Sequence, residues 1–90
     1  MKLFILEHCP HCKRARAWIE ELYEENSKYR DIPLEVIDED KESEIAESYD
    51  YYYVPCFFDG DTKLHEGVAS KEIIKDIFDN YLGGNKEWIF

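Results

Sequence analysis

Residues 2–16 read KLFILEHCPHCKRAR, and the tetrad Cys9-Pro10-His11-Cys12 closely follows an apolar run at residues 3–6. A short apolar run predicts a buried strand, and proline is favoured in the first turn of a helix, where its missing N–H would have no partner. The tetrad therefore lies at a strand-to-helix junction. A helix N-terminus carries about half a positive charge and unpaired N–H groups, and both stabilise a thiolate.

The residues after the tetrad predict different positions for the two cysteines. Cys12, Ala15, Ile19 and Leu22 recur at helical spacing, which predicts a helix from residue 10 to residue 27 or 28 with one face toward the core. Cys12 continues this apolar stripe, whereas Cys9 precedes the first turn. We therefore expect Cys9 to be exposed and Cys12 to be shielded.

The whole pattern predicts one α/β domain, residues 1–84, with the element order β-α-β-α-β-β-α and a short tail at 85–90. Strands are expected at 2–7, 33–38, 54–58 and 63–66, and further helices at 44–49 and 71–82. Ser43 and Ser70 are the expected N-caps, and Gly83-Gly84 is expected to end the last helix. That helix has an expected apolar face of Ile73, Ile74, Ile77, Phe78, Tyr81 and Leu82.

Composition excludes several classes of function. The 90 residues carry 21 acids against 11 Lys and Arg, a net charge of −10, whereas nucleic-acid phosphates favour a basic face. No apolar run approaches the roughly 20 residues of a membrane span, and no signal peptide is apparent. We therefore expect a cytoplasmic protein that binds neither nucleic acid nor membrane. A cysteine pair in that compartment is more often catalytic or metal-binding than structural.

Three features together resemble the glutaredoxin branch of the thioredoxin-like superfamily. They are the tetrad, Val54-Pro55 at the head of the third strand and Gly67 after the fourth. The resemblance covers residues 2–82 and implies a four-stranded mixed sheet flanked by three helices. It also implies a cis peptide bond before Pro55, with the main chain of Val54 contacting the substrate and Gly67 close to the same groove.

The chain departs from the family pattern after the fourth strand. Glu66 replaces one of the two glycines usual in glutaredoxins, and Ala69 and Ser70 replace acids that bind glutathione there. Lys13 could still hold a carboxylate of a glutathione-like molecule, and Tyr53 is the tyrosine of 49–53 best placed to contact an extended substrate. Glutathione and protein disulfides therefore both stay open as substrates.

The resemblance implies disulfide exchange at the tetrad. Cys9 is the expected nucleophile and Cys12 the resolving thiol, with Pro10 and a partly protonated His11 favouring the Cys9 thiolate. Substrates would be protein or low-molecular-weight disulfides, and an unidentified thiol reductant, glutathione included, would regenerate the dithiol. We expect no resident cofactor and a monomer.

Two other functions remain open. The cysteines could hold zinc with His8 or His11, or Cys9 could bridge an iron–sulfur cluster between two copies, although a second ligand pair for a structural zinc site is missing. The chain could also be a binding module without catalysis. Cys56 is expected to lie on the same strand face as Val54 and to behave as a small buried hydrophobe, with a regulatory thiol as the alternative.

Overall fold

The computed structural model describes residues 1–83, and its elements follow the predicted order with one addition. The Trp88–Phe90 tail lies outside the described residues. The elements are β1 (Lys2–Ile5), α1 (Pro10–Glu25), the 3₁₀-helix η1 (Ser27–Asp31), β2 (Glu35–Asp38), α2 (Ser43–Glu47), β3 (Cys56–Asp59), β4 (Thr62–Glu66) and α3 (Lys71–Leu82). The protein is thus of the α/β class, as predicted.

The first helix ends earlier than predicted, and the 3₁₀-helix η1 follows it. The helix ends at Glu25 rather than at residue 27 or 28, because Asn26 adopts an extended conformation with φ of −149°. The Asn26 side chain accepts a hydrogen bond from the backbone N–H of Lys28 and starts η1. Asparagine side chains compete with helical hydrogen bonds in this way.

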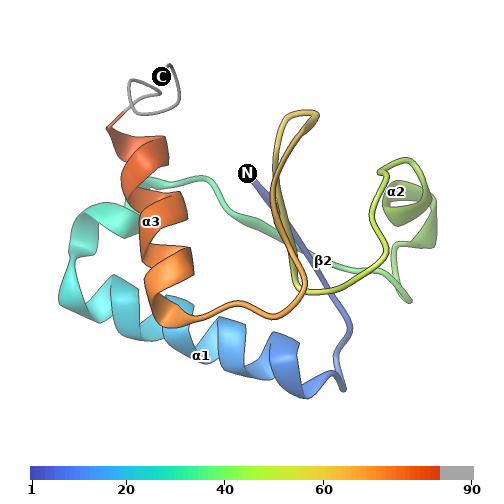
Figure 1. Cartoon of the computed structure of the whole chain (residues 1–90), viewed down its shortest axis with the longest axis horizontal. Coiled ribbons are helices and arrows are strands. Elements are labelled where there is room, and N and C mark those ends of the chain that lie inside the picture. The colour runs from blue at the N-terminus through green and yellow to red at the C-terminus, as the bar shows by residue number, and fades with distance from the viewer. Residues whose placement is uncertain (84–90) are drawn as a thin grey trace.

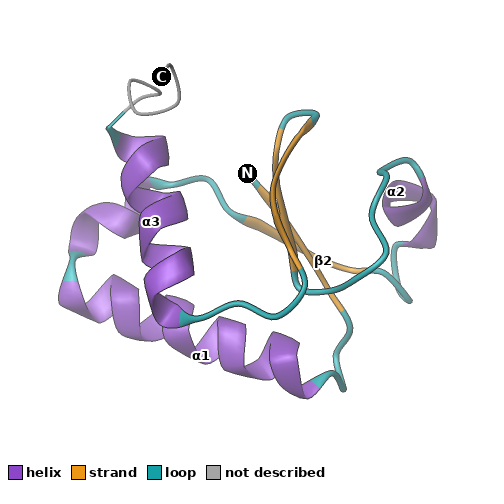
Figure 2. Ribbon diagram, in the orientation of Figure 1, coloured by secondary structure: helices purple, strands orange, loops and turns teal. Residues whose placement is uncertain are grey.

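The four strands form one mixed sheet in the order β2-β1-β3-β4. β1 pairs with β2 in parallel, and the other two pairs are antiparallel. In Figure 1, α1 and α3 lie on one side of the sheet and α2 on the other, and Figure 2 shows the strands between these helical layers. The parallel β1-α1-β2 crossover and the three-layer arrangement agree with the predicted fold class.

Alternating side chains of the central strands supply two separate cores. Leu3 and Phe57 face α1 and α3, where they join the buried stripe Cys12, Ala15, Ile19 and Leu22. Phe4 and Cys56 face the other way, toward Ala46 of α2. This alternation follows from the period-2 geometry of a strand. Cys56 is fully buried, as predicted, and shares its face with Phe58, whereas Val54, predicted on the same strand face, lies before the strand and packs against both cores.

The two predicted N-caps have different outcomes. The Ser70 hydroxyl accepts a hydrogen bond from the backbone N–H of Ile73, which confirms it as the cap of α3. Ser43 is wrong as a cap, because Glu42 occupies that position and Ser43 is the first helical residue. The backbone N–H groups of Lys41 and Glu42 both donate to the carbonyl of Asp38 and form a tight turn. Because of this turn, the helix begins one residue earlier than predicted.

The apolar face of α3 is narrower than predicted, and three strands are shorter, since β2 begins at Glu35 rather than at residue 33. Ile74, Ile77 and Phe78 are buried, whereas Ile73 and Leu82 are exposed because they lie at the margins of the stripe. β1 ends at Ile5, and β3 begins at Cys56 because Pro55 lacks the N–H that a ladder needs. Among residues 1–83, no helix has both the length and the apolarity needed to cross a membrane.

Candidate active site

Three chain segments meet at the end of the sheet at which β1 terminates. Phe4 pairs with Cys56, and Cys56 pairs with Glu66. The turn leading to Cys9, the loop before Pro55 and the turn after β4 therefore leave the sheet at the same end, which lies toward the bottom of Figure 1. The register thus brings together the three segments that carry the tetrad, Val54-Pro55 and Gly67.

Cys9 occupies the N-cap position of α1, with its backbone N–H donating to the carbonyl of Leu6 at 3.2 Å. Its side chain is half-buried and the thiol is free. Burial acts to raise the pKa of Cys9, but the backbone N–H of Cys12, the Cys12 thiol, the backbone N–H of His11 and the Arg14 charge together lower it below the ordinary value. The sulfur makes no capping hydrogen bond, so these groups act on its charge from close by.

Cys12 has the opposite environment. It is 1% exposed, and burial raises the pKa of its thiol to about 12. The neighbouring Cys9 raises that pKa further, while the backbone N–H of Leu6 acts against it. Cys12 is shielded, as predicted, whereas Cys9 is half-buried rather than exposed. When the pair loses a proton, the negative charge therefore resides on Cys9 rather than on Cys12.

The positive charge that lowers the pKa of Cys9 is that of Arg14. The Arg14 guanidinium lies 2.6 Å from Nδ1 of His11, one helical turn along. A guanidinium can only donate, so Nδ1 of His11 is the acceptor in this contact. His11 therefore acts on Cys9 through its backbone N–H and holds Arg14 with its ring. The contact between His11 and Arg14 could have been predicted from their i, i+3 spacing, which places two residues on the same face of a helix.

We expect the Cys9 thiol to react with iodoacetamide with a pH midpoint below the value of about 8.5 for a free thiol, because only the thiolate reacts. Arg14→Gln should shift this midpoint upward, since it removes the cation that lowers the pKa of Cys9. Arg16→Gln, which changes a charge on another side of α1, is the matched control and should leave the midpoint in place. Equal shifts in both variants would contradict the role of Arg14.

The predicted substrate-binding residues have defined positions. The Val54–Pro55 peptide bond is cis, as the resemblance implies. Gly67 has φ of +92°, a region that favours glycine, and its N–H donates to the carbonyl of Pro55 at 2.9 Å. The side chain of Tyr53 is 69% exposed, and Lys13 is exposed in the first turn of α1. Val54, Pro55, Tyr53 and Gly67 are thus adjacent, and Lys13 lies beside the tetrad.

Glu66 is a residue whose role the sequence did not reveal. Its carboxylate accepts hydrogen bonds from the backbone N–H groups of Tyr52 and Tyr53, the latter at 2.9 Å, and pairs with the Lys63 ammonium at 2.7 Å. Lys63 and the two N–H groups lower the pKa of Glu66 to about 2. Glu66 stands out in the sequence only as an acid in place of a glycine, with no local pattern that indicates its partners.

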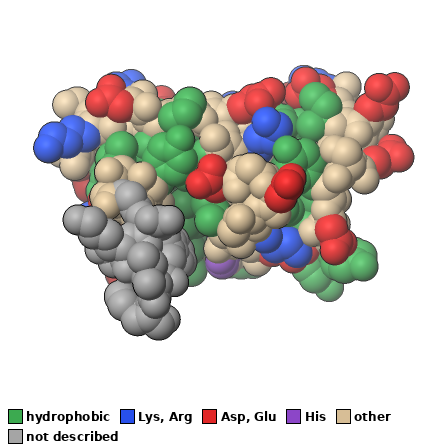
Figure 3. Space-filling view, turned by 90° about the horizontal axis from the view of Figure 1, so that it is seen from above, with side chains coloured by type: hydrophobic (Ala, Val, Ile, Leu, Met, Phe, Trp, Pro, Cys, Tyr) green, Lys and Arg blue, Asp and Glu red, His purple; other side chains and the backbone are tan. Residues whose placement is uncertain are grey.

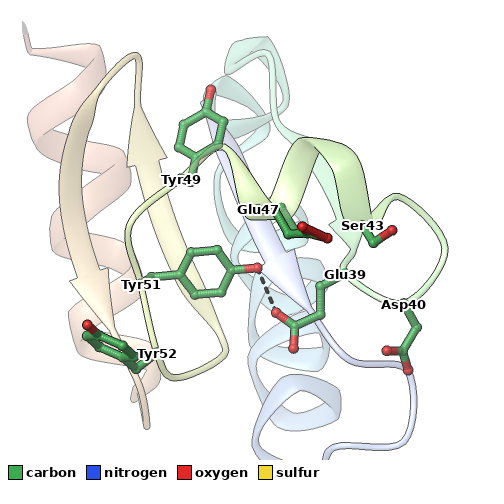
Figure 4. A pocket seen from close by; sticks show the side chains of 8 residues that line it. Glu39, Asp40, Ser43, Glu47, Tyr49, Tyr51 and Tyr52 are labelled. Carbon is green, nitrogen blue, oxygen red and sulfur yellow. Dashed lines mark hydrogen bonds between the residues drawn. The ribbon is translucent and has the colours of Figure 1, made fainter.

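Tyr49 and Tyr51, which precede Pro55 in the same loop, pack away from Cys9 and Cys12. Phe4 contacts Tyr49 and Tyr51, with both pairs of ring centroids 4.9 Å apart. The Tyr51 hydroxyl donates to Glu39 at 2.6 Å, and burial, followed by the Glu39 interaction, raises the pKa of Tyr51. Figure 4 shows this pair in a pocket of about 650 Å³ beneath α2, whose wall does not include either cysteine of the tetrad.

Acidic side chains are frequent on the surface near α2. Figure 3 shows the face that is uppermost in Figure 1, where acidic residues gather toward the end of the molecule that carries α2. The pocket beneath this helix is itself lined by Glu39, Asp40 and Glu47. In residues 1–83, no three His, Cys, Asp or Glu side chains are grouped so that they could hold a metal ion.

Comparisons with known proteins give no relative for this chain. No family model, no curated protein and no solved structure matches it.

Proposed function

We propose that the chain is a dithiol–disulfide oxidoreductase with a thioredoxin-like fold of the glutaredoxin type. The observation that carries this proposal is the contrast between the two thiols. Cys9 is accessible at the N-terminus of α1 with a lowered pKa, whereas Cys12 is buried one turn away with a pKa of about 12. One nucleophilic and one protected thiol are what a two-step exchange requires. The sheet order and the cis Val54–Pro55 bond support the fold assignment.

The first step is attack by the Cys9 thiolate on one sulfur of a substrate disulfide. A bond forms between Cys9 and that sulfur, the substrate S–S bond breaks, and the leaving sulfur takes up a proton from water. In the second step Cys12 loses its proton to water and attacks Cys9, which forms the Cys9–Cys12 disulfide and releases the second substrate sulfur as a thiol. The substrate gains two electrons and the protein loses two. Two equivalents of a small thiol, or one dithiol, restore the reduced protein.

The interaction between Cys9 and Cys12 favours the second step of the exchange. In the resting state the Cys9 thiolate raises the pKa of Cys12. Once Cys9 is held in a mixed disulfide, that negative charge is gone, while the backbone N–H of Leu6 still favours the Cys12 thiolate. The resolving thiol thus becomes more acidic when it is needed, and its attack is intramolecular, which raises its rate.

The reduction potential of the Cys9–Cys12 pair tests the proposal. Groups that stabilise the Cys9 thiolate stabilise the reduced form, so the potential should lie above the thioredoxin value of about −270 mV, at about −230 mV or higher. The protein is equilibrated against thiol–disulfide buffers of defined potential, and the oxidised fraction is counted by mass spectrometry after alkylation. Cys56→Ala, which removes the third thiol, should not change the result. The absence of a reversible two-electron couple would contradict the proposed function.

A further inference from the structure

Glu66, the last residue of β4, holds the loop before Pro55 by two hydrogen bonds and is itself paired with Lys63 of the same strand. One carboxylate oxygen accepts the backbone N–H groups of both Tyr52 and Tyr53, and the other accepts from Lys63. The side chain of Glu66 is 19% exposed, against 36% for Lys63, so the carboxylate is turned inward toward the loop. A surface ion pair alone would not need the two N–H groups, which come from 13 and 14 residues away.

The end of β4 therefore fixes the chain on both sides of Val54. Glu66 binds the two residues before it, and the N–H of the next residue, Gly67, binds the carbonyl of Pro55 after it. In the described part of the chain, neither the N–H nor the carbonyl of Val54 itself hydrogen-bonds to another backbone group. The main chain of Val54 is thus held in place from both sides and makes no backbone hydrogen bond of its own in the described residues.

Large exposed side chains precede Val54 in the loop and follow Gly67 in the turn after β4. Tyr52 is 85% exposed and Tyr53 is 69% exposed, and Val68, in the turn after β4, is 62% exposed. The ring of His65 bonds the carbonyl of Val68 at 2.9 Å and so fixes that turn as well. A polypeptide segment that runs past the site would cover these side chains, whereas a small disulfide only needs to reach Cys9.

We propose that Glu66 is a positioning residue that adapts this site to disulfides within extended polypeptides. By binding the N–H groups of Tyr52 and Tyr53, it fixes the Val54 main chain and the two exposed rings against which a substrate segment lies. The inference rests on the proposed function and names the substrate class of the same site. Glu66 does not touch the reacting sulfurs and acts through the loop.

The test compares two disulfides in single-turnover reactions of the pre-reduced protein. Insulin is the polypeptide probe, and bis(2-hydroxyethyl) disulfide is the small one. In Glu66→Ala, the ratio of the insulin rate constant to the small-disulfide rate constant should fall between about tenfold and a hundredfold, because the binding groove is misplaced. Glu66→Gln should recover most of the ratio, since its amide oxygen still accepts the two N–H groups. Amide hydrogen exchange of Tyr52 and Tyr53 should accelerate in Glu66→Ala and much less in Glu66→Gln.

Glu35→Ala is the matched control. It also removes a strand carboxylate paired with a lysine, Lys2 at 3.2 Å, but lies on the opposite edge strand. Its rate ratio and its Tyr52 and Tyr53 exchange should equal those of the unchanged protein. An unchanged ratio in Glu66→Ala, or an equal loss in both variants, overturns the inference alone. If the unchanged protein reacts with neither disulfide, the proposed function fails and the inference fails with it.

Discussion

Cys9→Ser should lower the rate of disulfide reduction at least about a thousandfold, whereas Cys12→Ser should still attack substrate and accumulate a mixed disulfide. Cys9 is the accessible thiol with the lowered pKa, so its loss removes the nucleophile. A serine hydroxyl at the same position stays protonated at neutral pH and cannot replace it. Loss of Cys12 leaves the first step intact and removes only the group that releases the product.

Single-turnover reaction with insulin, followed by acid quench and mass spectrometry, distinguishes the two variants. Cys9→Ser should show no adduct, and Cys12→Ser should show one covalent substrate per protein. Cys56→Ser provides the matched control, since it makes the same chemical change at a buried thiol in the core beneath α2. A Cys56→Ser protein that still folds should retain turnover. Undiminished turnover in Cys9→Ser would contradict the assignment of the nucleophile.

Local pattern was enough to predict the element order and the difference between the two thiols. The helical spacing from Cys12 to Leu22 and the alternation along residues 54–58 depend only on the period of each element, and burial follows directly from that period. Boundaries were less predictable, because they depend on single competing interactions. Asn26 ends α1 with its own side chain, and the turn on the Asp38 carbonyl moves the start of α2.

The contacts that shape the candidate site were harder to predict from the sequence. Glu66 meets the N–H groups of Tyr52 and Tyr53 only because β3 and β4 pair as they do and the chain then turns back at Pro55. Such a contact depends on tertiary register rather than on spacing. Tyr51 was similarly ambiguous, because a tyrosine that lines a groove and one that packs on a core have the same local pattern.

Phe4→Ala should cost about 3–5 kcal/mol of the free energy of unfolding, which is a large part of the roughly 5–15 kcal/mol available to a domain. Phe4 is fully buried in the central strand β1, and its ring contacts those of Tyr49, Tyr51 and Phe58. Its removal leaves a cavity beneath α2 that these rings cannot close without leaving their own contacts. Urea unfolding should show a lower midpoint with an unchanged slope.

Val36→Ala is the control for Phe4→Ala, because Val36 lies on the neighbouring strand β2 but is 40% exposed. This smaller change should cost about 1 kcal/mol or less. Phe4 belongs to the core on the α2 side, whereas Cys9 and Cys12 pack on the α1 side. The folded fraction of Phe4→Ala should therefore keep the pH midpoint of Cys9 alkylation. A loss of stability no larger than that of Val36→Ala would contradict the central position of Phe4, and a shifted midpoint would show that the two cores are coupled across the sheet.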